Sequence, residues 1–145
     1  MDNKIYKNRR NNLEKSLPKD SVLLIPGADT QFRNADSAYA FRQDSSFYYF
    51  SGFCEPSSLI AIVNNKDGIS SIAFVQPKDK LKEIWDGNRA GPIGAVDEFL
   101  FDKAYDNTQI DTIMPDILSG SSQVLYPIGK KSGFDQKVID WTTKA

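Results

Sequence analysis

The chain has 145 residues, of which 40% are hydrophobic and 26% are charged, and it contains nine Phe, six Tyr and two Trp. This length and mixture are typical of one folded domain spanning residues 1–145, and they exclude a disordered segment. The formal net charge of −1 supplies no overall positive field, so nucleic acid is not an expected partner.

The first half of the chain predicts a helix, a buried strand and a hairpin. Apolar residues recur at helical spacing over 4–17, just before Pro18, which indicates an amphipathic helix. Residues 21–25 form a continuous apolar run, which is typical of a strand buried on both faces. Two β-rich runs, 59–63 and 69–75, flank a turn sequence with a pair of Asn and an Asp-Gly, so we expect an antiparallel hairpin.

The second half of the chain alternates short helical and strand patterns. Asn107 or Thr108 is expected to cap a helix that ends at Gly120. The other expected elements are helices over 78–85, 93–100 and 134–141 and strands over 103–105 and 124–127. This alternation predicts an α/β fold, in which a mixed β-sheet is flanked by helices.

The segment ahead of the hairpin is too polar for a core strand and too aromatic for a solvated loop. One interpretation is an internal network in which two arginines pair with two aspartates at the start of a helix. The four residues are Arg33, Arg42, Asp36 and Asp44. The other interpretation is that part of the segment lines a binding cleft, because aromatic and Arg side chains are enriched in surfaces that a partner covers. The two interpretations are compatible.

Candidate catalytic groups are scarce in this sequence. Histidine is absent, which removes Ser-His and Cys-His nucleophile pairs and the commonest metal ligand. The single cysteine, Cys54, has no adjacent basic residue and is expected to be an incidental thiol. The loop 129–133 lacks the spacing of a phosphate-binding loop, and we expect a solvated turn. No catalytic residue and no metal site is therefore expected in this chain.

Trp85 lies in a turn-rich cluster, residues 83–91. An indole on such a loop offers a rigid apolar face with one hydrogen-bond donor. Composition alone favours packing of Trp85 in the domain's own core, and exposure at a binding site is the alternative.

The ends of the sequence suggest where the protein resides and how far it extends. The first residues lack the apolar core of a signal peptide, and no run approaches the roughly 18 apolar residues of a membrane span. A cytoplasmic protein without membrane contact is expected. Val138, Ile139 and Trp141 near the last residue suggest a helix that a longer chain would continue or cover.

Two long motifs carry a resemblance to a known family. The first runs Arg33-Asn34-x-Asp36-x-x-Tyr39-x-Phe41-Arg42-Gln43-Asp44-Ser45-x-Phe47-Tyr48-Tyr49-x-x-Gly52-Phe53-x-Glu55-Pro56, and the second runs Glu83-Ile84-Trp85-x-Gly87-x-Arg89-x-Gly91. In this order, and separated by the expected hairpin, they resemble the amino-terminal domain of the Xaa-Pro aminopeptidases (aminopeptidase P), in the creatinase and prolidase group of metallopeptidases.

The resemblance implies a non-catalytic domain with the creatinase/aminopeptidase P N-terminal fold. It also implies a "pita-bread" catalytic domain outside residues 1–145, where two manganese ions are held by two Asp, one His and two Glu. Such enzymes release the first residue of peptides whose second residue is proline. Two alternatives stay open: an interaction domain of an inactive peptidase-like protein, and the amino-terminal domain of a prolidase.

The resemblance further implies roles for individual residues. Trp85 is expected to reach from one subunit toward the substrate pocket of another, within a homo-oligomer that is a dimer or a tetramer. Asp36, Tyr39 and Arg42 are expected near the cleft or at subunit contacts. Asn88 stands where many relatives carry Arg, so a charge pair there is not expected.

Overall fold

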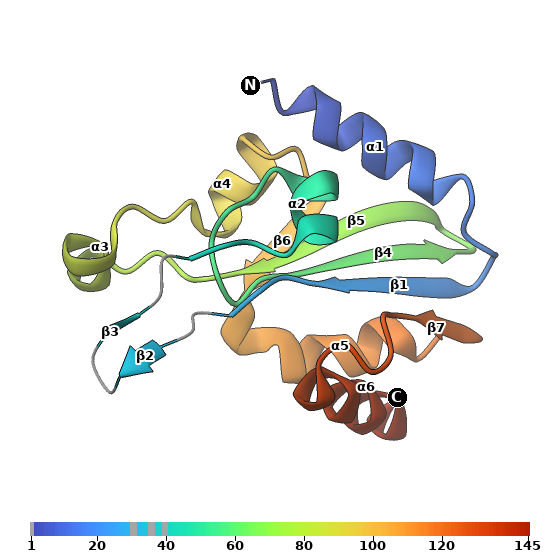
Figure 1. Ribbon diagram of the computed structural model, residues 1–145. Coiled ribbons are helices and arrows are strands. Elements are labelled where there is room, and N and C mark those ends of the chain that lie inside the picture. Colours follow the sequence, from blue (N-terminus) through green and yellow to red (C-terminus); the bar gives the residue numbers. More distant parts are fainter. Residues whose placement is uncertain (1, 30–31, 35–36, 39–40) are drawn as a thin grey trace.

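The computed structural model describes residues 2–29, 32–34, 37–38 and 41–145. Outside residues 28–52, its helices and strands follow the order that the sequence pattern predicts (Figure 1). Within 28–52 the structure has a two-stranded ribbon, 32–34 and 37–38, that was not predicted. The elements are α1 (Lys4–Glu14), β1 (Ser21–Pro26), β2 (Phe32–Asn34), β3 (Ser37–Ala38), α2 (Ser45–Ser51), β4 (Leu59–Asn65), β5 (Gly68–Val75), α3 (Lys80–Asp86), α4 (Gly91–Asp97), β6 (Lys103–Asp106), the 3₁₀ turn η1 (Asn107–Gln109), α5 (Ile110–Leu118), β7 (Gln123–Leu125) and α6 (Ser132–Lys144).

The central sheet has five strands in the order β6-β5-β4-β1-β7. β4 pairs antiparallel with both β1 and β5, whereas the outer strands β7 and β6 run parallel to their neighbours β1 and β5. The predicted hairpin is confirmed as β4–β5, and the sheet is mixed as expected. β2 and β3 form a separate two-stranded ribbon.

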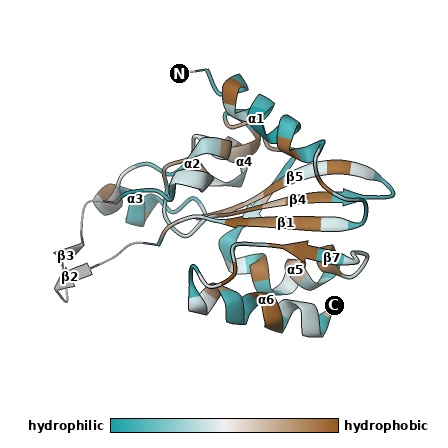
Figure 2. Ribbon diagram, turned by 45° about the vertical axis from the view of Figure 1, so that its right-hand side comes forward, coloured by the Kyte–Doolittle hydropathy of each residue, from teal (hydrophilic) through white to brown (hydrophobic). Residues whose placement is uncertain are grey.

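Side chains alternate between the two faces of the sheet, and helices cover each face (Figure 1). Along β4, Leu59, Ala61 and Val63 belong to a core shared with α5 and α6. Ile60 and Ile62 belong to a second core, on the face covered by α1, α2 and α4. Figure 2 shows the resulting hydrophobic colouring of the central strands. Because both faces are covered, β1 and β4 are continuous apolar runs, as the sequence suggests.

Most helix boundaries differ by a few residues from the predicted ones. The first helix ends at Glu14, and the chain then makes the short-range hydrogen bonds Ser16 N to Leu13 O and Leu17 N to Glu14 O. The predicted side-chain cap by Asn107 or Thr108 is wrong: neither η1 nor α5 has a side-chain cap, and the Asn107 amide donates to Ser57 O at 2.9 Å. A 3₁₀ turn leads into α5 instead.

Arg10 joins the elements that cover the second core. Its side chain is 1% exposed, and its two terminal nitrogens donate to Phe50 O and Phe99 O, both at 2.8 Å. The guanidinium also lies 3.9 Å from the centre of the Phe101 ring. Burial lowers the pKa of Arg10 to about 10. Arg10 therefore ties α1 to the end of α2 and to the segment after α4.

A carboxylate on α5 makes the stability of the first core depend on pH. Oδ1 of Asp111 accepts from the Trp141 indole at 2.9 Å, and Lys137 lies 3.1 Å from Oδ2. The hydrogen bond from Trp141, followed by that from Lys137, lowers the pKa of Asp111. A carboxyl with a lowered pKa stabilises the fold above its unfolded-state value of about 4, and this contribution is lost as pH falls through the folded-state value.

Asp111→Asn is therefore expected to lower the free energy of unfolding by less than about 1 kcal/mol near pH 6, because the ion pair is solvent-exposed. The difference from the wild-type chain should shrink as pH falls below about 4, where the carboxyl begins to be protonated. Urea unfolding at pH 6 and at a series of pH values below 4 measures it, with the exposed Asp116→Asn on the same helix as the control. An equal difference at all of these pH values would contradict the assignment.

Candidate functional site

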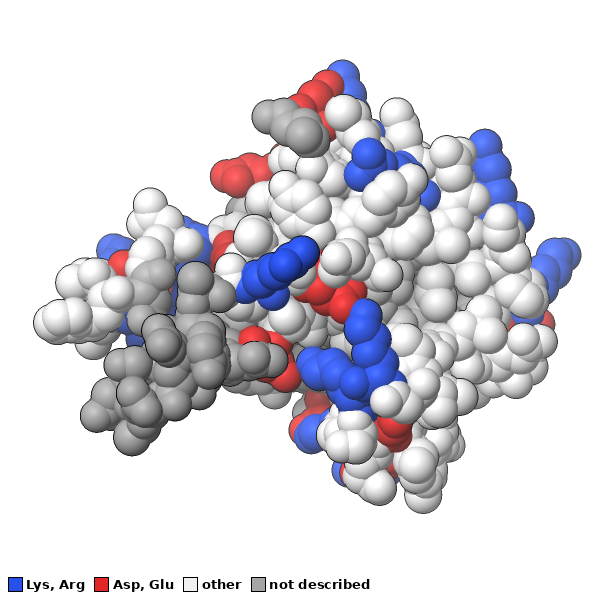
Figure 3. Space-filling view, viewed as in Figure 1, with Lys and Arg blue, Asp and Glu red and all other residues white. Residues whose placement is uncertain are grey.

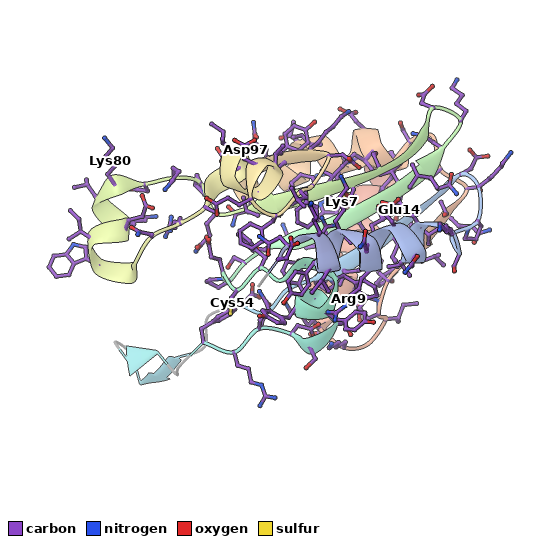
Figure 4. The ribbon with its side chains drawn as sticks, turned by 90° about the horizontal axis from the view of Figure 1, so that it is seen from above. Lys7, Arg9, Glu14, Cys54, Lys80 and Asp97 are labelled. Atoms are coloured by element: carbon purple, nitrogen blue, oxygen red, sulfur yellow. The ribbon has the colours of Figure 1, made fainter. Side chains whose placement is uncertain are left out.

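Helix α3 lies apart from the sheet and presents an apolar face to solvent. Leu81, Ile84 and Trp85 are 75%, 73% and 87% exposed. Their spacing of three and four residues places them on one side of the helix. Figure 1 shows α3 displaced from the layers, Figure 2 shows hydrophobic colouring on it, and Figure 4 shows Lys80 on this helix, away from the sheet.

The sequence around α3 explains why a seven-residue helix forms here. At its start, Oδ1 of Asp79 accepts from Leu81 N at 3.1 Å and from Lys82 N at 3.2 Å. At its end, Gly87 adopts a φ of 92° and its N–H bonds to Glu83 O at 3.0 Å. Such a short helix is marginal alone, so its flanking residues matter. We call residues 78–91 the α3 arm.

The two ends of the α3 arm are fastened to each other. Oε1 of Glu83 accepts from Arg89 N at 2.6 Å and from Lys78 Nζ at 3.2 Å. The bond from the Arg89 amide, followed by that from Lys78, lowers the pKa of Glu83. Arg89 is buried, and its Nη1 donates to Pro77 O at 3.2 Å. These contacts close the base of the arm into a loop.

Residues of the first motif bind the α3 arm to the body of the domain. Oε2 of Glu55 accepts from Ala90 N at 2.9 Å. Burial raises the pKa of Glu55 even though the bond from Ala90 opposes this. Gln43 is buried; its side chain donates to Glu55 O and Phe53 O and accepts from Ala28 N. The structure therefore brings the two sequence motifs together at the base of the arm.

The structure places only part of the predicted site. Asp36 and Tyr39 lie outside the described residues. Arg42 is exposed and lines a hollow of about 430 Å³ with Arg9, Tyr49 and Cys54; Figure 4 shows how Arg9 and Cys54 lie. Arg9 stacks over the Tyr49 ring at 4.1 Å. Trp85 does not line this hollow.

The expected network around Asp44 has a different basic partner. Its carboxylate caps α2 by accepting from Phe47 N at 3.0 Å, and it pairs with Lys130. The neighbouring Lys131 bonds to Gly27 O and Asp29, both at 3.1 Å. The loop 129–133, expected to be a solvated turn, is thus attached to the body. Figure 3 shows basic and acidic side chains side by side near the middle of the face of the molecule that is turned to the viewer.

Trp85 is not part of the domain's own core, so the interpretation from composition is wrong. The helical spacing of Leu81, Ile84 and Trp85, between a capping Asp79 and Gly87, was a signal that the sequence already contained. Glu55 carries no comparable signal, because Ala90 lies 35 positions away in sequence.

Within the described residues there is no group of three or more His, Cys, Asp or Glu suited to a metal ion. No described helix is long and apolar enough to cross a membrane.

Comparisons with known proteins identify relatives over nearly the whole chain. The sequence profile of the "Aminopeptidase P, N-terminal domain" family matches residues 6–126. A Xaa-Pro aminopeptidase of Haemophilus influenzae is 33% identical over 121 residues, covering 83% of this chain and 28% of that protein. Pseudomonas aeruginosa aminopeptidase PepP superposes with a TM-score of 0.93 at 32% identity, covering 99% of this chain and 32% of that one. A zinc-substituted Escherichia coli aminopeptidase P in complex with product gives 0.94 at 29% identity, covering 99% and 33%.

The fold and the α3 arm together define an α/β domain in which one apolar helix lies outside the core and is exposed to solvent. The chain belongs to the family of aminopeptidase P N-terminal domains. The structural matches confirm the predicted family and fold. The chain spans about a third or less of the length of these relatives.

Proposed function

We propose that this chain is the amino-terminal part of a Xaa-Pro aminopeptidase, which removes the first residue from peptides with proline in second position. Here the domain supports homo-oligomerisation, and Trp85 completes the substrate pocket of a neighbouring subunit. The observation that carries the proposal is the exposed apolar face of α3, with Trp85 87% exposed. A folded domain gains nothing by holding Leu81, Ile84 and Trp85 in water unless another surface covers them.

The metal of such an enzyme is proposed for a catalytic domain outside residues 1–145. The present residues do not fit a metal site: the sequence lacks histidine, and the described part has no cluster of ligand side chains. Two manganese ions elsewhere in the protein would activate the attacking water. The contribution of this chain would be to narrow the pocket and exclude water. A cytoplasmic location is part of the same proposal.

Trp85→Ala in the full-length protein is expected to lower kcat/KM for X-Pro peptides by about tenfold or more, because the pocket would lose a large rigid wall. Steady-state kinetics on tripeptides with manganese measure this. Ile93→Ala is the matched control, because Ile93 is 77% exposed and lies on α4 outside the arm. Unchanged kinetics for Trp85→Ala would remove Trp85 from the pocket.

A mixing experiment tests whether Trp85 acts between subunits. Trp85→Ala subunits keep their own metal site, and subunits lacking a metal ligand keep Trp85. If Trp85 serves the neighbouring pocket, mixed oligomers should be more active than either parent alone. If it serves its own pocket, mixing should recover none. No activity on X-Pro tripeptides in the unmodified protein would favour a prolidase or an inactive relative.

A further inference from the structure

The direction of the α3 arm is not set by packing of its own apolar side chains. Leu81, Ile84 and Trp85 all point into solvent, and none of the α3 side chains that the structure describes is buried. Hydrogen bonds at the base of the arm must therefore hold it. Those accepted by Glu83 join the two ends of the arm to each other, and one from Arg89 reaches Pro77 O, just ahead of the arm.

Glu55 links the outgoing end of the arm to another part of the body. Its carboxylate accepts from Ala90 N, just before α4 begins at Gly91. Its own backbone carbonyl is held by Gln43, which also bonds to the loop after β1 through Ala28 N. Lys78, where the arm begins, lies next to Gly91, where the arm ends: a Cβ added to Gly91 would be 2.8 Å from Lys78 Cγ. A chain of hydrogen bonds thus runs from the body, through Glu55, to the base of the arm.

The two carboxylate oxygens of Glu55 have different surroundings. Within the described part of the chain, Oε1 is buried without a hydrogen-bond partner, whereas Oε2 accepts from Ala90 N. A buried polar atom without a partner lowers stability. The bond that Oε2 makes to Ala90 is therefore the contact by which this side chain fixes local geometry.

We infer that Glu55 is the positioning residue of the α3 arm: through the Ala90 amide, its carboxylate fixes the direction in which α3 presents Trp85. The consequence for catalysis rests on the proposed function, whereas the attachment of the arm does not. Glutamine at position 55 keeps an oxygen acceptor for Ala90 N, and alanine does not. Ala90→Pro removes the donor and leaves Glu55 intact, at a residue whose φ of −68° suits proline.

The test combines limited trypsin digestion with kinetics, both on the full-length protein. Mass spectrometry follows cleavage after Lys80 and Lys82, which are exposed on α3. Glu55→Ala and Ala90→Pro should each speed this cleavage by about tenfold, because local opening exposes the arm. Glu55→Gln should cleave at the wild-type rate, as should the control Glu98→Ala, an exposed glutamate on the surface.

The two readouts separate the inference from the proposed function. In Glu55→Ala, kcat/KM for X-Pro peptides should fall by about tenfold, and Glu55→Gln should stay within about twofold of wild type. Faster cleavage with unchanged kinetics would keep Glu55 as the positioning residue and remove Trp85 from the pocket. Wild-type cleavage rates in both Glu55→Ala and Ala90→Pro would overturn the inference, whatever the kinetics. If Glu55→Ala does not fold, the Ala90→Pro result alone decides.

Discussion

Arg10→Met is expected to lower the free energy of unfolding by about 3–5 kcal/mol. The buried guanidinium donates to two backbone carbonyls, and hydrogen bonds to charged groups contribute roughly 1.5–3 kcal/mol each. Methionine fills much of the space but leaves Phe50 O and Phe99 O without their donor. The elements around the second core would then be held by apolar contacts and by surface hydrogen bonds such as that from Arg9 to Tyr49 O. Denaturant unfolding of the 145-residue chain measures the change.

Arg9→Met is the matched control for Arg10→Met. Arg9 is adjacent in sequence, but its contacts lie at the surface, over the Tyr49 ring and at Tyr49 O. The expected loss is about 1 kcal/mol or less. Similar losses for the two variants would show that the buried contacts of Arg10 contribute little to stability.

Gly52→Ala is the second substitution with a large expected effect, a loss of roughly 2–4 kcal/mol. Gly52 ends α2 with a φ of 66°, a conformation that alanine adopts at a cost of about 1 kcal/mol. A Cβ at this position would also overlap the buried ring of Tyr6 on α1. Relieving such an overlap in a packed interior typically costs a further 1–3 kcal/mol.

Gly129→Ala separates the two contributions in Gly52→Ala. Gly129 has a φ of 84°, nearer to that of Gly52, but a Cβ there would meet nothing within 4 Å. Its substitution should therefore show the backbone strain alone, about 1 kcal/mol. Thermal or denaturant unfolding of both variants gives the comparison. If the two lose the same stability, the close approach of Tyr6 to Gly52 does not matter.

The sequence predicted those parts of the fold in which the deciding information is local. The β4–β5 hairpin follows from two apolar runs around an Asn-Asn-Lys-Asp-Gly turn. Asp44 was correctly expected near the start of α2, because a capping side chain bonds to an amide only three residues on. Its ion pair with Lys130 was not predicted, since 86 positions separate the two in sequence.

The candidate site, too, was predicted from the sequence only where the deciding information is local. The family motifs pointed to Trp85, and the structure adds that it shares an exposed helix face with Leu81 and Ile84. Composition favoured a buried Trp85, because a Trp is usually a core residue, and no local rule overrides that average. The link from Glu55 to Ala90 joins two distant motifs and becomes visible only when the sheet brings them together.

The parallel pairing of β1 with β7 bears on how the chain is made. Ser21 lies opposite Gln123, whereas β1, β4 and β5 are all complete by Val75. During synthesis the antiparallel unit can therefore form while one edge of β1 is still unpaired, until residues 123–125 have left the ribosome. An open, apolar strand edge readily pairs with another chain. Nascent chains that stall before residue 123 would for that reason be exposed to edge-to-edge association, and a chaperone that shields β1 would be needed only in that interval.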